Sequence, residues 1–157
     1  MSSATGKPIR DDRISQLAAF RVGSEEYVID IMRIKEIINP IKITPVPGSS
    51  ELLEGVINLR GVIIPLVDLR KRFGLPPRDG AQRPKYIIVS VLQKNVGIIV
   101  DEVLEVLRLP RSLVKQAPQL FSQREAGMFL GVCQYQDRLL MLLDLKKVLS
   151  PVVNELG

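Results

Sequence analysis

The feature that most constrains the fold is an internal repeat of apolar segments. The segment GVINLRGVIIPLVDLRKRF begins at Gly55, and the similar segment GVCQYQDRLLMLLDLKKVL begins 76 residues later, at Gly131. Both open with Gly-Val, pass through a turn, and continue as an apolar run that ends in Leu-x-Asp-Leu, a basic residue and Lys. Strands rich in Val, Ile and Leu can resemble one another by chance, but aligned Gly-Val and Asp-Leu pairs are harder to obtain in that way. The repeat therefore predicts two copies of one small β unit.

Two weaker matches give each copy the same upstream elements: Ile29–Ile37 with Ile98–Val106, and Leu17–Val22 with Tyr86–Val91. A five-stranded unit of about 70 residues can close into a small barrel filled by side chains. We therefore expect an all-β domain over residues 14–150, with lobes at roughly 14–80 and 81–150. The sequence leaves open whether the two lobes are sequential or exchange strands. Flexible tails are expected at 1–13 and 151–157. Two packed lobes would leave a groove at their junction, where binding sites are common.

Turn residues locate the expected strands. Gly23-Ser24 predicts a hairpin between Leu17–Val22 and Glu26–Ile31, and Arg60-Gly61 predicts a second between Gly55–Leu59 and Val62–Leu66. Further strands are expected at Ile41–Val46, Lys85–Leu92, Gly97–Val106, Phe129–Tyr135 and Arg138–Leu143.

Helix is expected to be scarce. Asp68 and Asp144 hold equivalent repeat positions, and each is predicted to cap a short helix through its carboxylate. The segment Ile31–Ile38 suits a helical face by its spacing, but its β-branched residues favour a strand.

The composition argues against most catalytic chemistry. The chain has no His, no Trp and one Cys, which removes the commonest general base and any cysteine-only metal cluster. No phosphate-binding glycine loop or nucleophile elbow is present, so we expect no cofactor, no metal and no catalytic residue. No run of about 18 apolar residues or signal sequence is found, which predicts a cytoplasmic protein with no direct membrane insertion.

The net charge of +5 permits an acidic partner, including nucleic acid. The Lys and Arg residues are dispersed, however, and aromatic residues make up only 4% of the chain, too few for extensive base stacking. The densest basic run, Arg70-Lys71-Arg72, with Arg78 nearby, is interpreted as a solvated face. A nucleic-acid-binding barrel and a carboxylate-based enzyme remain the less favoured alternatives.

Four blocks closely resemble the CheW family of chemotaxis coupling proteins. They are EYVIDIMRIKEI from Glu26, EGVINLRGVIIPLVDLR from Glu54, VGIIVDEVLEVL from Val96 and RLLMLLDLKKVL from Arg138. The resemblance covers about residues 16–150 in the family's order. The NLRG block is specific in combination with the other three.

The resemblance implies a fold of two small five-stranded, SH3-like β-barrels with a few short helices. It implies a non-catalytic adaptor that joins the cytoplasmic tip of a methyl-accepting chemoreceptor to the regulatory domain of a CheA-type histidine kinase. Such an adaptor would lie in receptor arrays at the inner face of the membrane. The alternative is a CheW-like protein that binds receptor without kinase, in a parallel motility or developmental pathway.

The resemblance also implies which residues bind partners. Arg60, in a turn beside Gly61, matches the NLRG arginine that the family links to receptor and kinase coupling, and Glu36 matches a glutamate with the same association. A solvated turn arginine, or an ion pair between Glu36 and Arg60, are the structural alternatives.

The aliphatic residues Ile31, Ile34, Val100 and Val103 match positions that line the receptor-binding groove of the family. An amphipathic helix needs such an apolar floor, although plain core packing explains the same residues. Gly55 and Gly97 match family glycines, and a backbone requirement would make any effect of their substitution on binding indirect.

Overall fold

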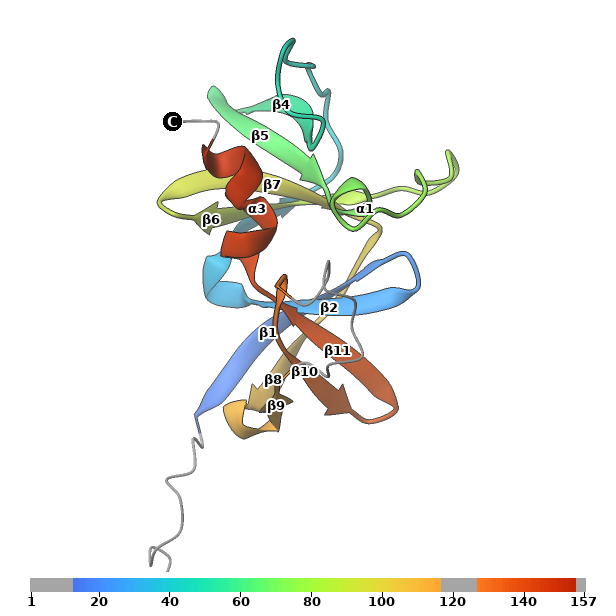
Figure 1. Ribbon diagram of the computed structural model, residues 1–157, viewed down its shortest axis with the longest axis vertical. Coiled ribbons are helices and arrows are strands. Elements are labelled where there is room, and N and C mark those ends of the chain that lie inside the picture. Colours follow the sequence, from blue (N-terminus) through green and yellow to red (C-terminus); the bar gives the residue numbers. More distant parts are fainter. Residues whose placement is uncertain (1–12, 117–126, 155–157) are drawn as a thin grey trace, which may run out of the picture.

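The computed structural model describes residues 13–116 and 127–154, and β-strands dominate it (Figure 1). The predicted N-terminal tail lies outside the described residues except for Arg13. The strands are β1 (Ile14–Val22), β2 (Glu25–Asp30), β3 (Ile34–Ile38), β4 (Leu53–Leu59), β5 (Val62–Asp68), β6 (Lys85–Val91), β7 (Lys94–Val100), β8 (Glu102–Pro110), β9 (Val114–Lys115), β10 (Phe129–Tyr135) and β11 (Arg138–Leu143). The helical elements are η1 (Ile31–Arg33), α1 (Leu69–Arg72), η2 (Arg111–Leu113) and α3 (Leu145–Val153).

The strands form two sheets, which Figure 1 shows as two lobes, one above the other. Lobe 1 has the strand order β8-β1-β2-β11-β10-β9, and lobe 2 has the order β3-β6-β7-β5-β4. The all-β class and the scarcity of helix are confirmed. Lobe 1 has a sixth strand, the two-residue β9, where five were expected. Closure of each sheet into a barrel stays a prediction.

The two sheets repeat the same plan strand for strand, as the sequence repeat predicts. In each lobe the central pair is parallel, with Leu142 opposite Val28 in lobe 1 and Leu66 opposite Gly97 in lobe 2. The sixth strand of lobe 1 also has a counterpart, because Thr44 forms an isolated bridge to Val56 on β4 just as β9 pairs with β10. Two copies of one β unit therefore account for both lobes.

The lobes exchange strands, an arrangement that the sequence leaves open. Lobe 2 is one continuous stretch from β3 to β7, whereas lobe 1 combines β1 and β2 with β8–β11. The chain crosses between lobes twice, once after Asp30 through η1 and once at Asp101 between β7 and β8. The run Gly97–Val106, expected as one strand, is therefore divided at Asp101.

Within the described ranges, three clusters of buried side chains stabilise the fold. One small cluster fills lobe 1 around Leu17, Val28 and Leu140, and another fills lobe 2 around Ile57, Leu66 and Ile88. The largest lies between the lobes and joins β1, β2, β6, β7 and α3 into one core. Each fully buried Val, Leu or Ile contributes about 1.5–3 kcal/mol relative to an exposed side chain, so the inter-lobe core makes a large contribution to stability.

Both predicted helix caps are confirmed. The Asp68 carboxylate accepts a hydrogen bond from the Arg70 amide at 3.0 Å, and the Asp144 carboxylate accepts from the Lys147 amide at 3.2 Å. The segment Ile31–Ile38, for which the sequence allowed a helix or a strand, contains one of each: the 3-10 helix η1 is followed directly by the strand β3.

Helix α3 is longer than the sequence suggests. It continues through Pro151 to Val153, so residues 151–153, expected to begin the C-terminal tail, are helical, and Val152 and Val153 are buried. Pro151 cannot donate a hydrogen bond to the Lys147 carbonyl. That carbonyl accepts instead from the Arg72 guanidinium, at 3.4 Å, so the neighbouring lobe compensates for the missing donor.

The expected strand Ile41–Val46 is reduced to the single bridge at Thr44. Its amide donates to the Val56 carbonyl and its carbonyl accepts from the Val56 amide, both at 2.8 Å. Pro45 lacks a donor, so the pairing does not extend. No helix in the described part of the chain is long and apolar enough to cross a membrane.

Candidate partner-binding surfaces

Arg60 lies at the tip of the β4–β5 hairpin, where the backbone requires a left-handed turn. Arg60 has φ +51° and Gly61 has φ +86°, as in the tight turns that connect paired strands. The Asn58 side-chain oxygen accepts a hydrogen bond from the Gly61 amide at 2.8 Å and fixes the turn. The Arg60 side chain is 68% exposed. The turn thus presents an arginine to solvent, as predicted.

Glu36 and Arg60 form the ion pair that the sequence left as an alternative. One guanidinium nitrogen of Arg60 lies 3.2 Å from Glu36 Oε2, and another contacts Oε1, so the pairing is bidentate. These hydrogen bonds, which Arg60 donates and Glu36 accepts, lower the pKa of Glu36 and raise the pKa of Arg60. The pair joins β3 to the β4–β5 turn at the outer end of lobe 2.

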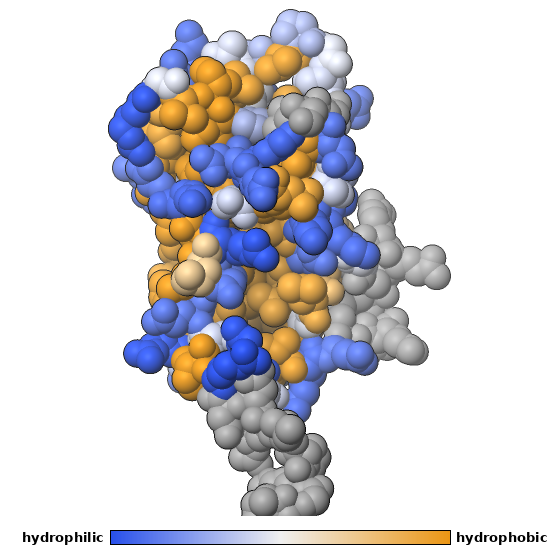
Figure 2. Space-filling view, turned by 90° about the vertical axis from the view of Figure 1, so that its left-hand side faces the viewer, coloured by the Kyte–Doolittle hydropathy of each residue, from blue (hydrophilic) through white to orange (hydrophobic). Residues whose placement is uncertain are grey.

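Exposed aliphatic side chains accompany this ion pair. Ile37, Val62 and Ile63 are 42%, 53% and 59% exposed, and they neighbour Glu36 and Arg60 in the chain. We call these five residues the lobe 2 patch. Figure 2 shows hydrophobic surface over the upper lobe on the face it views, interrupted by hydrophilic side chains. Exposed aliphatic side chains of this kind are ones that a partner protein can bury.

Lobe 1 carries a related group at equivalent repeat positions. Val106 and Leu139, the counterparts of Ile37 and Ile63, are 57% and 43% exposed. Here Arg138 contacts Glu105 at 2.5 Å and also Glu26 at 2.6 Å. Hydrogen bonds to these two carboxylates raise the pKa of Arg138. The two lobe ends share their aliphatic residues but differ in how their charges are paired.

The four predicted groove residues do not share one environment. Ile31, Ile34 and Val103 are half-buried and pack against the inter-lobe core, so each keeps some surface for a partner. Val100 is fully buried within that core and is a packing residue. None of the four lines the main pocket at the lobe junction, which is described below.

Gly55 and Gly97 are required by the backbone rather than by a partner. Gly55 has φ +148°, and a β-carbon there would lie 2.5 Å from the Thr44 carbonyl oxygen. At Gly97 a β-carbon would overlap the Leu66 side chain of the neighbouring parallel strand. Both glycines therefore permit close strand packing, and neither offers a side chain to a partner.

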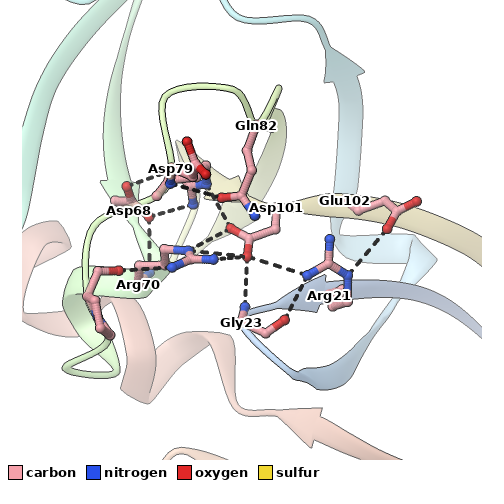
Figure 3. A network of polar contacts seen from close by, with 10 residues as sticks. Arg21, Gly23, Asp68, Arg70, Asp79, Gln82, Asp101 and Glu102 are labelled. Carbon is pink, nitrogen blue, oxygen red and sulfur yellow. Dashed lines mark hydrogen bonds and ion pairs between the residues drawn. The ribbon is translucent and has the colours of Figure 1, made fainter.

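A buried ion network at the junction of the lobes was missed by the sequence analysis (Figure 3). Its centre is Asp101, whose side chain is fully buried at the crossing from β7 to β8. Its carboxylate accepts hydrogen bonds from Arg70 at 2.6 Å, from Arg78 at 2.7 Å and from the Gly23 amide at 2.8 Å. Burial would raise the pKa of Asp101, but these hydrogen bonds outweigh it and hold the pKa well below its usual range.

Arg78 extends the network to lobe 2. Its guanidinium donates to both oxygens of Asp68, at 3.0 and 3.1 Å, while its Nε donates to Asp101. The prediction that Arg70, Arg72 and Arg78 belong to a solvated face is wrong. Arg70 and Arg78 are only 13% and 11% exposed, and Arg72 donates to the Val148 carbonyl at 2.8 Å. The signal that could have revealed the network is Asp101 itself, a charged residue within an apolar run.

No group of three or more potential ligands is arranged to hold a metal ion within residues 13–116 and 127–154. The arrangement of charges and exposed aliphatics is suited to contacts with other proteins.

Comparison with known proteins agrees with this geometry. The model of the CheW-like domain matches residues 16–152. The chain is 33% identical to the probable chemotaxis protein CheW of Rhizobium etli, over 99% of both chains. It is 31% identical to the chemotaxis protein CheW of Helicobacter pylori, over 95% of this chain and 90% of that one. The crystal structure of a scaffolding protein, TtCheW from Thermoanaerobacter tengcongensis, superposes with a TM-score of 0.79 at 31% identity, covering 87% of this chain and 92% of that one.

Proposed function

The chain belongs to the CheW-like family, and on that premise we propose that it is a non-catalytic adaptor that couples chemoreceptors to a CheA-type histidine kinase. It would act in the cytoplasm, in receptor arrays at the inner face of the membrane. No cofactor takes part in this proposal, because the protein only brings its partners together.

The observation that carries the proposal is the lobe 2 patch. Its Glu36–Arg60 pair is exposed and bidentate, and three exposed aliphatic residues lie within three positions of it in the chain. A regulatory domain of the kinase would bury the aliphatic residues and place a carboxylate or carbonyl against the guanidinium. Because Glu36 already orients Arg60, little side-chain entropy is lost when the partner binds.

The receptor tip is assigned to a second surface, the half-buried residues Ile31, Ile34 and Val103 near the two crossings between lobes. These residues come from η1, β3 and β8 and so combine both lobes. An amphipathic helix that lays its apolar stripe on such a surface is a common mode of recognition.

Direct binding measurements test the proposal. The full chain should bind a purified CheA-type regulatory domain and a receptor-tip fragment with dissociation constants below about 50 μM. Absence of binding to both partners would contradict the adaptor function. Binding to the receptor fragment alone would favour the alternative of a receptor-binding protein that acts without the kinase.

The surface assignment has its own control. Arg60→Ala should weaken binding to the kinase domain, whereas Arg108→Ala, an exposed arginine on β8 outside the patch, should leave it unchanged. The melting temperature of both variants should stay close to that of the parent protein. A large fall in the melting temperature of Arg60→Ala would show that Arg60 stabilises the fold and would refute the assignment.

A further inference from the structure

A pocket of about 510 Å³ opens at the junction of the lobes, beside the first turn of α3. Its floor is apolar and includes Leu17, Ile29 and Val91, each 3% exposed or less. Its lining also includes Leu92 and Leu130, which are 45% and 61% exposed. Large aliphatic side chains left in water beside an apolar cavity are suited to receive an apolar side chain from outside.

Five charged residues also line this pocket, and their sum is positive. The acidic members, Asp30 and Asp144, accept hydrogen bonds from the backbone amides of Met32 and Lys147. The basic members are Arg33, Arg111 and Lys146. Within the described ranges, Arg111 donates to the Ser15 hydroxyl at 3.2 Å, and none of the three pairs with a carboxylate. Among the described residues, the pocket therefore offers cations without acidic partners.

Lobe 2 holds an arginine between a cap aspartate and a crossover aspartate. The repeat matches Asp144 and Lys146 with Asp68 and Arg70, and Asp30 and Asp101 both stand where the chain leaves one lobe for the other. In lobe 2, Arg78 lies between the two acids and donates hydrogen bonds to both. In lobe 1, no arginine among the described residues bridges Asp30 and Asp144. The junction side of lobe 2 is thus closed by one of the chain's own arginines, whereas no described arginine does so beside the pocket of lobe 1.

We propose that this pocket is a docking site for an acidic amphipathic segment of a partner protein. A bulky apolar side chain of that segment enters the cavity between Leu92 and Leu130. Carboxylates beside it in the segment meet Arg33, Arg111 and Lys146. The net charge of +5 on the whole chain favours approach of such a segment. No residue of the lobe 2 patch, and none of Ile31, Ile34 and Val103, lines the pocket.

Two synthetic peptides probe the proposal with the full chain. Both present Leu and Phe at helical spacing, one flanked by glutamates and the other by lysines. Fluorescence anisotropy should give a dissociation constant of about 10–100 μM for the acidic peptide and at least tenfold weaker binding for the basic one. No binding of the acidic peptide, or equal or stronger binding of the basic one, would overturn the proposal.

Matched variants then locate the binding. The double variant Arg33→Gln/Lys146→Gln removes two lining cations, whereas Lys35→Gln/Lys147→Gln removes two exposed neighbours that do not line the pocket. The first should weaken binding of the acidic peptide about tenfold or more and the second less than about twofold. Equal losses would reveal non-specific attraction and contradict the site.

An apolar pair of variants completes the test. Leu130→Glu should abolish binding of the acidic peptide, and Leu139→Glu, on an exposed position outside the pocket, should not. Arg60→Ala should leave peptide binding unchanged, so failure of this site and failure of the adaptor function give different results. If Leu130→Glu binds the acidic peptide as well as the parent protein does, the pocket is not where it binds.

Discussion

Lobes 1 and 2 share a backbone plan but differ where each one meets the other. Lobe 2 holds Arg78 between Asp68 and Asp101 and buries the resulting ion network, whereas lobe 1 leaves an apolar pocket with Asp30 and Asp144 in its lining. The outer ends differ too, because Glu36 pairs with a turn arginine and Glu105 with an arginine that also holds Glu26. The plan of strand pairing is therefore shared by both lobes. The polar side chains that the strands carry differ from one lobe to the other.

The largest difference between the lobes should appear on removal of the crossover aspartates. Asp101→Asn leaves Arg70 and Arg78 buried with too few acceptors and should lower the free energy of unfolding by about 3–5 kcal/mol. Asp30→Ala removes only the cap of η1 and should cost about 0.5–1 kcal/mol. Urea denaturation of both variants checks the comparison. Equal losses would show that the two crossings are energetically alike.

The repeated glycines should resemble each other more closely. Gly55 and Gly131 each face a carbonyl of the strand segment beside them, Thr44 and Lys115 respectively, so alanine at either position should cost about 2–4 kcal/mol. Gly55→Ala should be the more damaging because Gly55 also has a positive φ. Gly61→Ala, in open space, should cost about 1 kcal/mol from backbone strain alone. Thermal unfolding of the three variants gives the order.

Low pH should lower the free energy of unfolding through Asp101, at the crossing between the lobes. The pKa of Asp101 is lowered in the folded protein, so its contribution to stability is fully present above the unfolded value of about 4 and is lost as the pH falls towards the folded value. The parent protein should therefore lose more unfolding free energy than Asp101→Asn as the pH falls from about 5 to 2. Parallel pH dependences for the two proteins would contradict the role of the network.

Small effects should also come from the charged pairs at the lobe ends. Arg138→Ala breaks contacts with two half-buried or exposed carboxylates and should cost about 1 kcal/mol. Arg60→Ala should change the melting temperature less than Arg138→Ala does, because its pair with Glu36 is the more exposed. Calorimetry on the two variants compares them directly. A larger loss for Arg60→Ala would reverse the assignment of Arg60 to binding rather than stability.

The repeat made most of the fold predictable. Local signals such as Arg60-Gly61, Asp68 and Asp144 identified a turn and two helix caps because each depends on its neighbours in the chain. The Glu36–Arg60 pair could be named because both positions carried a family resemblance. The aliphatic positions could not be assigned inward or outward from their pattern, and so Val100, a core residue, stood among the binding residues.

The ion network around Asp101 could not be predicted from the sequence for a different reason. Its partners Arg70, Arg78 and Gly23 are 31, 23 and 78 residues away, and no local pattern links them. The division of the run Gly97–Val106 between the lobes was not predicted either, because no Gly or Pro near Asp101 marks the point where one strand ends and the next begins. Only the three-dimensional crossing shows why a charged residue interrupts that run.

The exchange of strands has a consequence for biosynthesis. Lobe 2 is encoded without interruption between β3 and β7, so all of its strands are available to pair once β7 leaves the ribosome. The β1–β2 hairpin is translated before lobe 2, yet its sheet neighbours β8 and β11 are translated after lobe 2. Until they emerge, the nascent hairpin carries two unpaired edges, and a stop codon or cleavage after β7 would leave those edges permanently open to aggregation.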